Sequence, residues 1–221
     1  MYIVFFGPPG AGKGTYSKIL SQMLHLPVFA TGDMFRAEIE SESELGARIG
    51  KFVSAGELVP DDIVGEVIAD VLSRDDAKNG AIFDGFPRTI AQAKMLDRIL
   101  TNMGKKLKLV LELQAPDELI VRRLSNRRLC PKCGRIYNMI SDPPKNDEIC
   151  DDDGAKVFLR DDDKPETIRN RLKVYYRQTA PIIEYFKTIK NLLYVEIDTG
   201  GVPEVGKENM LRILRQHRIL R

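Results

Sequence analysis

The chain has 221 residues, of which 43% are apolar and 30% are charged, with 34 basic residues against 32 acidic ones. This length allows one large core or a core with a smaller appended domain. The formal net charge of +2 excludes the single-sign excess typical of proteins that coat nucleic acid or anionic membranes. The chain shows no basic leader and no run of 18 apolar residues, so we expect a cytoplasmic protein without a signal peptide or membrane span.

Short apolar segments alternate with segments of helical period along most of the chain. Such alternation is typical of a parallel sheet covered by helices on both faces. We therefore predict a three-layer α/β fold with five parallel strands, at residues 3–6, 26–29, 81–85, 107–113 and 192–198. Helices are predicted at residues 13–24, 88–100, 116–124 and 202–216.

Two stretches interrupt this alternation. Residues 31–60 hold helical patterns without an obvious strand, and residues 126–163 are rich in turns and carry all three cysteines. We interpret both as insertions in the sheet domain. The predicted boundaries are a core of residues 1–29, 60–125 and 164–221, a helical insertion of 30–59 and a small lid of 126–163.

The segment GPPGAGKGT, residues 7–15, follows the first predicted strand and opens the first helix. It completes the phosphate-loop pattern G-x-x-x-x-G-K with Gly7, Gly12 and Lys13. Glycines let the backbone turn tightly and present N–H groups to phosphate oxygens, and the helix N-terminus adds partial positive charge. The segment therefore predicts a binding site for a nucleoside triphosphate at Gly10, Ala11, Gly12, Lys13, Gly14 and Thr15.

Gly14 stands where this pattern normally has a serine or threonine that holds magnesium. We therefore expect Mg²⁺ to be held mainly by the nucleotide phosphates and water, with Asp84 as the supporting carboxylate. Asp84 ends a predicted strand, at the edge of the sheet where ligands bind in open α/β folds. The alternative is that Asp84 caps the following helix.

Four motifs together resemble adenylate kinase in its long-lid form. They are GPPGAGKGT, TGDMFR at residues 31–36, DGFPRT at 84–89 and the basic helix ending RLSNRR at 123–128. The resemblance implies the reaction ATP + AMP = 2 ADP, with a P-loop core, an AMP-binding insertion and a mobile lid over ATP. It also implies a monomer whose partners are ATP, AMP and ADP, without nucleic acid or membrane.

The resemblance also assigns site residues. AMP would contact Thr31, Arg36, Glu57, Leu58, Val59, Gly85, Phe86, Pro87, Arg88, Gln92, Arg160 and Arg171. Beyond the phosphate loop, ATP would contact Arg123, Arg127, Ile136, Tyr137 and Gly201. The catalytic groups would be Lys13, Asp84, Arg88, Arg127, Arg160 and Arg171. Planar guanidinium groups match phosphate oxygens in pairs, which suits these arginines. We interpret Arg122, Arg128, His25 and His217 as surface residues.

The three cysteines lie in two similar segments, CPKCG at residues 130–134 and CDDDG at 150–154. The first is a zinc knuckle, and the second copies its spacing with Asp153 in place of the second cysteine. Four protein ligands leave no open position, so we predict a structural zinc ion bound by Cys130, Cys133, Cys150 and Asp153. Iron could occupy the same ligands. The alternatives without metal are reduced thiols beside acidic turns, or a Cys130–Cys133 disulfide.

Two other functions stay open at this point. A UMP or CMP kinase shares the phosphate loop and DGFPR, although Thr31, Gln92 and the long lid favour AMP. A P-loop nucleotide switch with a zinc-ribbon module for a partner is the rival of another class. The sequence shows no recognisable guanine-specificity motif and no basic aromatic stripe to support it.

Overall fold

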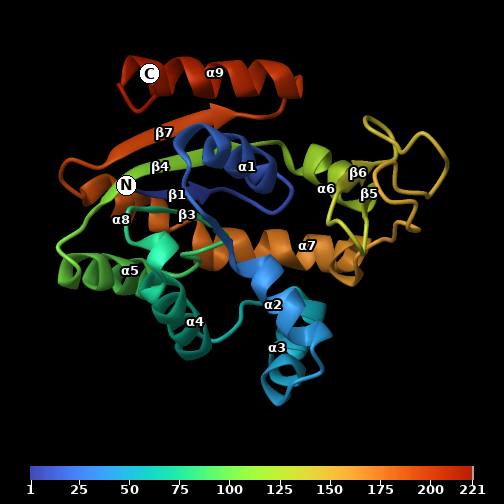
Figure 1. The fold of residues 1–221 in the computed structure, drawn as a ribbon, viewed down its shortest axis with the longest axis horizontal. Coiled ribbons are helices and arrows are strands. Elements are labelled where there is room, and N and C mark those ends of the chain that lie inside the picture. Colours follow the sequence, from blue (N-terminus) through green and yellow to red (C-terminus); the bar gives the residue numbers. More distant parts are fainter. Residues whose placement is uncertain (221) are drawn as a thin grey trace.

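The computed structural model describes residues 1–220, and its centre is a five-stranded parallel sheet (Figure 1). The strand order is β2–β3–β1–β4–β7. The strands are β1 (Tyr2–Phe6), β2 (Val28–Ala30), β3 (Ala81–Asp84), β4 (Leu107–Gln114) and β7 (Leu193–Asp198). The predicted fold class and all five predicted strands are confirmed.

Helices cover both faces of the sheet because successive residues of a strand point to opposite sides. Tyr2, Val4 and Phe6 of β1 belong to a core shared with one set of helices, whereas Ile3 and Phe5 belong to a core on the other face. The first face is covered by α4 (Asp61–Ser73), α5 (Ile90–Asn102) and α8 (Ile182–Thr188). The second is covered by α1 (Lys13–Leu24) and α9 (Pro203–Gln216).

The first insertion is a pair of helices, α2 (Thr31–Glu40) and α3 (Glu44–Ala55), as the helical patterns predict. Helix α3 begins where the side chain of Ser43 accepts a hydrogen bond from the Gly46 amide. It ends at Gly56, whose φ of 71° is a left-handed conformation that glycine adopts readily. The chain then runs through Glu57–Pro60 into α4.

The second insertion follows α6 (Asp117–Ser125) and projects at one end of the molecule (Figure 1). Its regular structure is an antiparallel pair, β5 (Arg127–Leu129) and β6 (Ile136–Asn138), followed by a short 3₁₀ turn at Asp161–Asp163. Most of its remaining backbone forms turns. We keep the name lid for residues 126–163.

Some elements were missing from the sequence prediction. They are α4, α7 (Pro165–Val174), α8 and a π-helical segment at Tyr175–Thr179 that joins α7 to α8. Helix α5 begins two residues after the predicted start, because the Thr89 side chain accepts a hydrogen bond from the Gln92 amide and caps it. Among the described residues, no helix has the length and apolar character needed to cross a membrane.

Candidate active site

The phosphate loop joins the end of β1 to the start of α1. Gly12 has a φ of 97°, so glycine suits the turn into the helix. The Lys13 side chain folds back over the loop, and its Nζ donates to the carbonyl oxygens of Gly7 and Pro8, both at 2.8 Å. Burial lowers the pKa of Lys13 to about 8. An anion in front of the loop would therefore stabilise its charged form.

Asp84 lies beside this loop at the carboxyl end of β3, paired in register with Phe5 of β1. A Cβ atom placed on Gly14 would lie 3.4 Å from Asp84 Oδ2. Burial raises the pKa of Asp84, and the nearby charges of Lys13 and Arg88 oppose this rise. Because Thr89 caps α5, Asp84 is not the cap of the following helix. A partly buried carboxylate next to the position that lacks a hydroxyl fits a bound cation.

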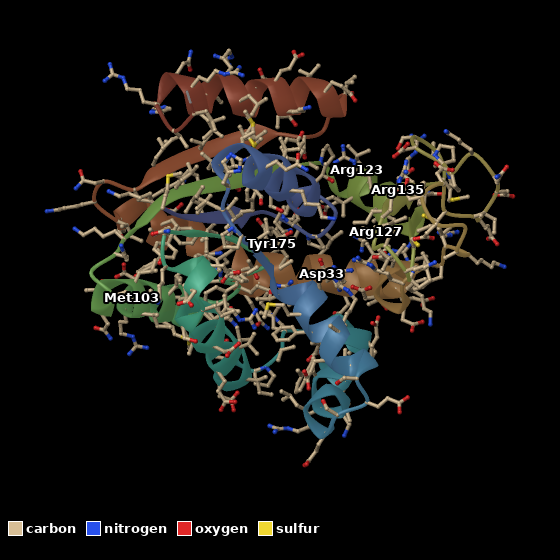
Figure 2. The ribbon with its side chains drawn as sticks, viewed as in Figure 1. Asp33, Met103, Arg123, Arg127, Arg135 and Tyr175 are labelled. Carbon is tan, nitrogen blue, oxygen red and sulfur yellow. The ribbon has the colours of Figure 1, made fainter. Side chains whose placement is uncertain are left out.

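A cavity of about 820 Å³ opens in front of the loop. Core, helical insertion and lid all contribute to its lining. Figure 2 labels Asp33 of α2, Arg123 of α6, Arg127 of the lid and Tyr175 of the π-helical segment, which line the cavity from separate parts of the chain. The predicted basic residues that line it are Lys13, Arg36, Arg88, Arg123, Arg127, Arg160 and Arg171. The fold thus brings together arginines that the sequence leaves far apart.

Arg88 is held at the backbone and at the side chain. Its amide donates to Gln92 Oε1 at 2.7 Å, its carbonyl oxygen accepts from Thr179 Oγ1 at 2.8 Å, and its Nε donates to Gly85 O at 2.7 Å. Burial lowers the pKa of Arg88 to about 10. The guanidinium group therefore has a fixed position, and its terminal nitrogens face a site that favours an anion.

Two aspartates, Asp162 and Asp163, orient Arg127 of the lid and Arg171 of α7. Arg127 makes a two-point contact with Asp163, in which Nε and Nη2 each lie 2.7 Å from a carboxylate oxygen. Arg171 Nη1 lies 3.0 Å from Asp162 Oδ2 and 3.3 Å from Asp163 Oδ1. Both carboxylates are buried. Sequence reasoning missed these two residues, although RDDDKPETIRNR carries them between two predicted arginines.

Arg160 lacks a complete set of partners. Its Nε is buried and has no hydrogen-bond partner within residues 1–220, and one terminal nitrogen lies 3.7 Å from Asp33 Oδ1. Asp33 also pairs with Arg36. Burial lowers the pKa of Arg160 to about 10. An unpaired buried guanidinium nitrogen costs free energy, so this arrangement favours an anionic ligand.

A smaller pocket of about 60 Å³ lies beside the large cavity and shares Arg36, Arg88 and Arg171 with it. Its other predicted lining residues are Glu57, Leu58, Val59, Gly85 and Gln92. Thr31 and Phe86 are buried and lie outside both linings, and the Thr31 hydroxyl donates to Gly85 O at 2.8 Å. Pro87 lines the large cavity.

At the opposite end of the large cavity, Arg123 Nη2 donates to the Thr199 carbonyl oxygen at 2.6 Å. Thr199 lines the cavity, as do Ile136 and Tyr137 of the lid. Gly201 is exposed and is not among the residues that line the cavity. Thr199 is therefore the residue of the DTGG segment that the structure brings to the site, and the ATP contact of Gly201 stays a prediction.

The two cysteine segments of the lid have the same backbone geometry. Cys130 N donates to Arg135 O, and Gly134 N donates to Cys130 O. The second segment repeats both bonds five and four residues after Cys150, at Ala155 and Gly154. This repetition confirms that CDDDG copies the turn of CPKCG, and it places Asp153 where the first turn has its second cysteine.

The four predicted ligands lie together, with their ligand atoms all within 4.8 Å of one another. Cys133 Sγ lies 3.6 Å from Cys150 Sγ, and Cys130 Sγ lies 3.3 Å from Asp153 Oδ2. Tetrahedral zinc with sulfur at about 2.3 Å and oxygen at about 2.1 Å places its ligands roughly 3.5–3.8 Å apart. The cluster therefore fits a metal ion, and all three cysteines are free rather than paired in a disulfide.

A phosphate loop and converging arginines, with a second pocket sharing three of those arginines, define a P-loop phosphotransferase of the nucleoside monophosphate kinase class. The family model described as adenylate kinase matches residues 5–191. Proteins named adenylate kinase from Thermosipho africanus and Thermotoga petrophila are 48% and 52% identical to this chain. The alignments cover 98% and 94% of this chain, and 100% and 94% of the relatives. A third, from Caldicellulosiruptor bescii, is 44% identical over 94% of this chain and 96% of its own length.

The chain belongs to the adenylate kinase family. It is a phosphotransferase that binds ATP, AMP and ADP and catalyses ATP + AMP = 2 ADP. Enzymes of this family use Mg²⁺ with ATP.

Proposed function

We propose that the large cavity binds ATP across the phosphate loop and that the smaller pocket binds AMP, with the shared arginines between the two phosphates. The observation that carries this proposal is the sharing of Arg36, Arg88 and Arg171 by the two pockets. Phosphoryl transfer through a loose transition state needs alignment and charge stabilisation more than a strong base. Basic side chains fixed between two nucleotides supply both.

The individual roles follow from position. Lys13 would bind the β- and γ-phosphates of ATP, and Arg36 and Arg88 would bind the AMP phosphate. Arg127, Arg160 and Arg171 would surround the transferred group, where the buried unpaired Nε of Arg160 favours negative charge. Mg²⁺ bound with ATP would supply further charge neutralisation, and Asp84, beside Gly14, would be its supporting carboxylate.

We further propose that the helical insertion 30–59 and the lid 126–163 close over the bound nucleotides. Both segments line the large cavity together with the core, so their approach would exclude water from ATP. The metal at Cys130, Cys133, Cys150 and Asp153 would be a structural zinc ion. Its place within the turns of the lid supports a role in holding the lid's shape.

Kinetics of two variants test this division into an ATP side and an AMP side. Arg36→Ala should raise the KM for AMP by about tenfold or more while changing the KM for ATP little, because it removes charged hydrogen bonds to one phosphate. Arg123→Ala should do the reverse. Equal effects of both variants on the two KM values would contradict the assignment.

A further inference from the structure

Asp61 is the first residue of α4 and forms a hydrogen bond to Gln92, a side chain that lines the small pocket. Gln92 lines the pocket and is only 2% exposed. Its Nε2 donates to Asp61 Oδ1 at 2.7 Å, and its Oε1 accepts from the Arg88 amide at 2.7 Å. Thr89 Oγ1 donates to both Asp61 oxygens, at 3.0 and 3.3 Å. Hydrogen bonds from two side chains, Thr89 and Gln92, therefore hold the carboxylate.

These contacts fix which way the Gln92 amide faces. The Arg88 backbone N–H can only donate, and the Asp61 carboxylate can only accept. Rotating the amide by 180° would bring its NH₂ group against the Arg88 N–H and its oxygen against the carboxylate. The rotated state loses two hydrogen bonds inside a buried site, so Gln92 holds one orientation.

The fixed amide keeps one hydrogen-bonding capacity at each end. Its oxygen has a second lone pair, and its NH₂ group has a second hydrogen. A 6-aminopurine presents an N–H donor at position 6 beside the acceptor N1, which complements an oxygen beside an NH₂ group. A 6-oxopurine presents the reverse pattern, an acceptor at position 6 beside an N1–H donor. Only the first pattern matches Gln92 in its fixed orientation.

We propose that Asp61 is a positioning residue that sets base specificity, by locking Gln92 in the orientation that accepts 6-aminopurine monophosphates and rejects 6-oxopurine ones. This inference rests on the proposed function, in which AMP occupies the small pocket. Asp61 acts through Gln92 and does not line the pocket itself.

The wild-type protein offers a test that needs no substitution. Three acceptors are compared by kcat/KM with ATP as donor: AMP, inosine monophosphate, and purine riboside monophosphate, which carries only hydrogen at position 6. A locked Gln92 predicts that inosine monophosphate is the poorest acceptor, because a mismatched pair of groups is worse than a missing contact. An amide free to rotate would pair with the 6-oxopurine and make it a better acceptor than purine riboside monophosphate, which would overturn the proposal.

Asp61→Asn tests the lock itself, because an amide at this position can donate as well as accept. We expect the ratio of kcat/KM for AMP to that for inosine monophosphate to fall about tenfold. Asp62→Asn is the matched control, since Asp62 is exposed in the same first turn and its neutralisation has the same effect on the helix charge. Its ratio should equal that of the wild type.

The outcomes distinguish a failure of the proposed function from a failure of the role of Asp61. If the wild type forms no ADP from ATP and AMP, the proposed function fails. If it does, but Asp61→Asn keeps the wild-type preference for AMP over inosine monophosphate, only the role of Asp61 fails. A loss of activity towards both acceptors by the same factor would also count against a specificity role.

Discussion

The Thr179 side chain holds the backbone of Arg88 from a distance of 91 residues along the chain, with Oγ1 and the carbonyl oxygen 2.8 Å apart. Thr179 ends the π-helical segment Tyr175–Thr179 and is buried. π-helical turns are rare and frequently lie at functional sites. Here the segment places a hydroxyl group against the backbone of Arg88, one of the arginines that line both pockets.

Replacing this hydroxyl should reduce catalysis more than stability. Thr179→Val keeps the shape but removes the donor, and it should lower kcat by about tenfold, since a buried hydrogen bond contributes about 1 kcal/mol and Arg88 would lose alignment. Thr179→Ser keeps the hydroxyl group and should retain most of the rate. Steady-state kinetics of both variants measure this, and equal rates for the two would show that the hydroxyl has no positioning role.

Arg88 itself should be far more sensitive. Arg88→Ala removes a partly buried cation between the two proposed phosphate positions, so we expect kcat to fall by about 10²–10³-fold with the fold intact. Arg98→Ala is the control, because Arg98 lies on helix α5, which follows Arg88, and is exposed. Circular dichroism checks folding of both variants. Near-normal turnover by a folded Arg88→Ala protein would remove Arg88 from the catalytic groups.

The lowered pKa of Lys13 should make ATP binding weaker at alkaline pH. Burial places its pKa at about 8 in the protein without nucleotide, so the side chain loses its positive charge as the pH rises through 8. The kcat/KM for ATP, which reports the free enzyme, should therefore fall above this pH. Bound phosphates favour the charged form, so kcat should stay level to a higher pH.

Calorimetric titration of each nucleotide between pH 7 and 9 checks this prediction. ATP affinity should fall across the range. AMP affinity should stay nearly constant, because the pKa of Arg88 is about 10 and the group stays charged. A parallel fall in both affinities would assign the effect to something other than Lys13.

The lid cluster should bind one metal ion per chain and stabilise the lid more than it affects the chemistry. Asp153→Ala should lower the bound metal measured by elemental analysis, with Asp147→Ala as the control at an exposed lid position. Removing the metal with a chelator should lower Tm by about 4 °C or more, with a smaller loss of activity at moderate temperature. An unchanged Tm after complete removal would contradict a structural ion.

The sequence predicted the sheet because its strands are short and mostly apolar, such as YIVFF and LKLVLEL, which suits burial on both faces. Helix α1 was predicted with the bounds Lys13–Leu24 that the structure gives. Helices α4, α7 and α8 were missed. Helices α4 and α7 directly follow the two insertions, and α8 follows α7 with no strand between them, so the regular alternation of strand and helix does not guide the prediction there.

The site residues also divide into those that the sequence predicts and those that only the fold shows. The phosphate loop could be recognised from residue types alone, because its glycines and lysine act over a few consecutive positions. Arg36, Arg88 and Arg171 meet only because distant elements pack together, and no pattern over a few neighbouring residues predicts this. The aspartates that orient the arginines were missed for the same reason. Thr199 was missed because the resemblance implies a backbone carbonyl near the last strand, and residue types do not show which carbonyl of DTGG faces the site.

The rate of ADP formation from ATP with a series of monophosphates tests the central claim most directly. A coupled assay with AMP, UMP, CMP or no acceptor measures it on the wild-type protein. We predict that turnover requires an acceptor and is at least about 100-fold more efficient with AMP than with UMP or CMP, because the pocket has buried groups that a pyrimidine would leave unpaired. Equal or faster turnover with UMP or CMP, or ATP hydrolysis that needs no monophosphate, would contradict the account.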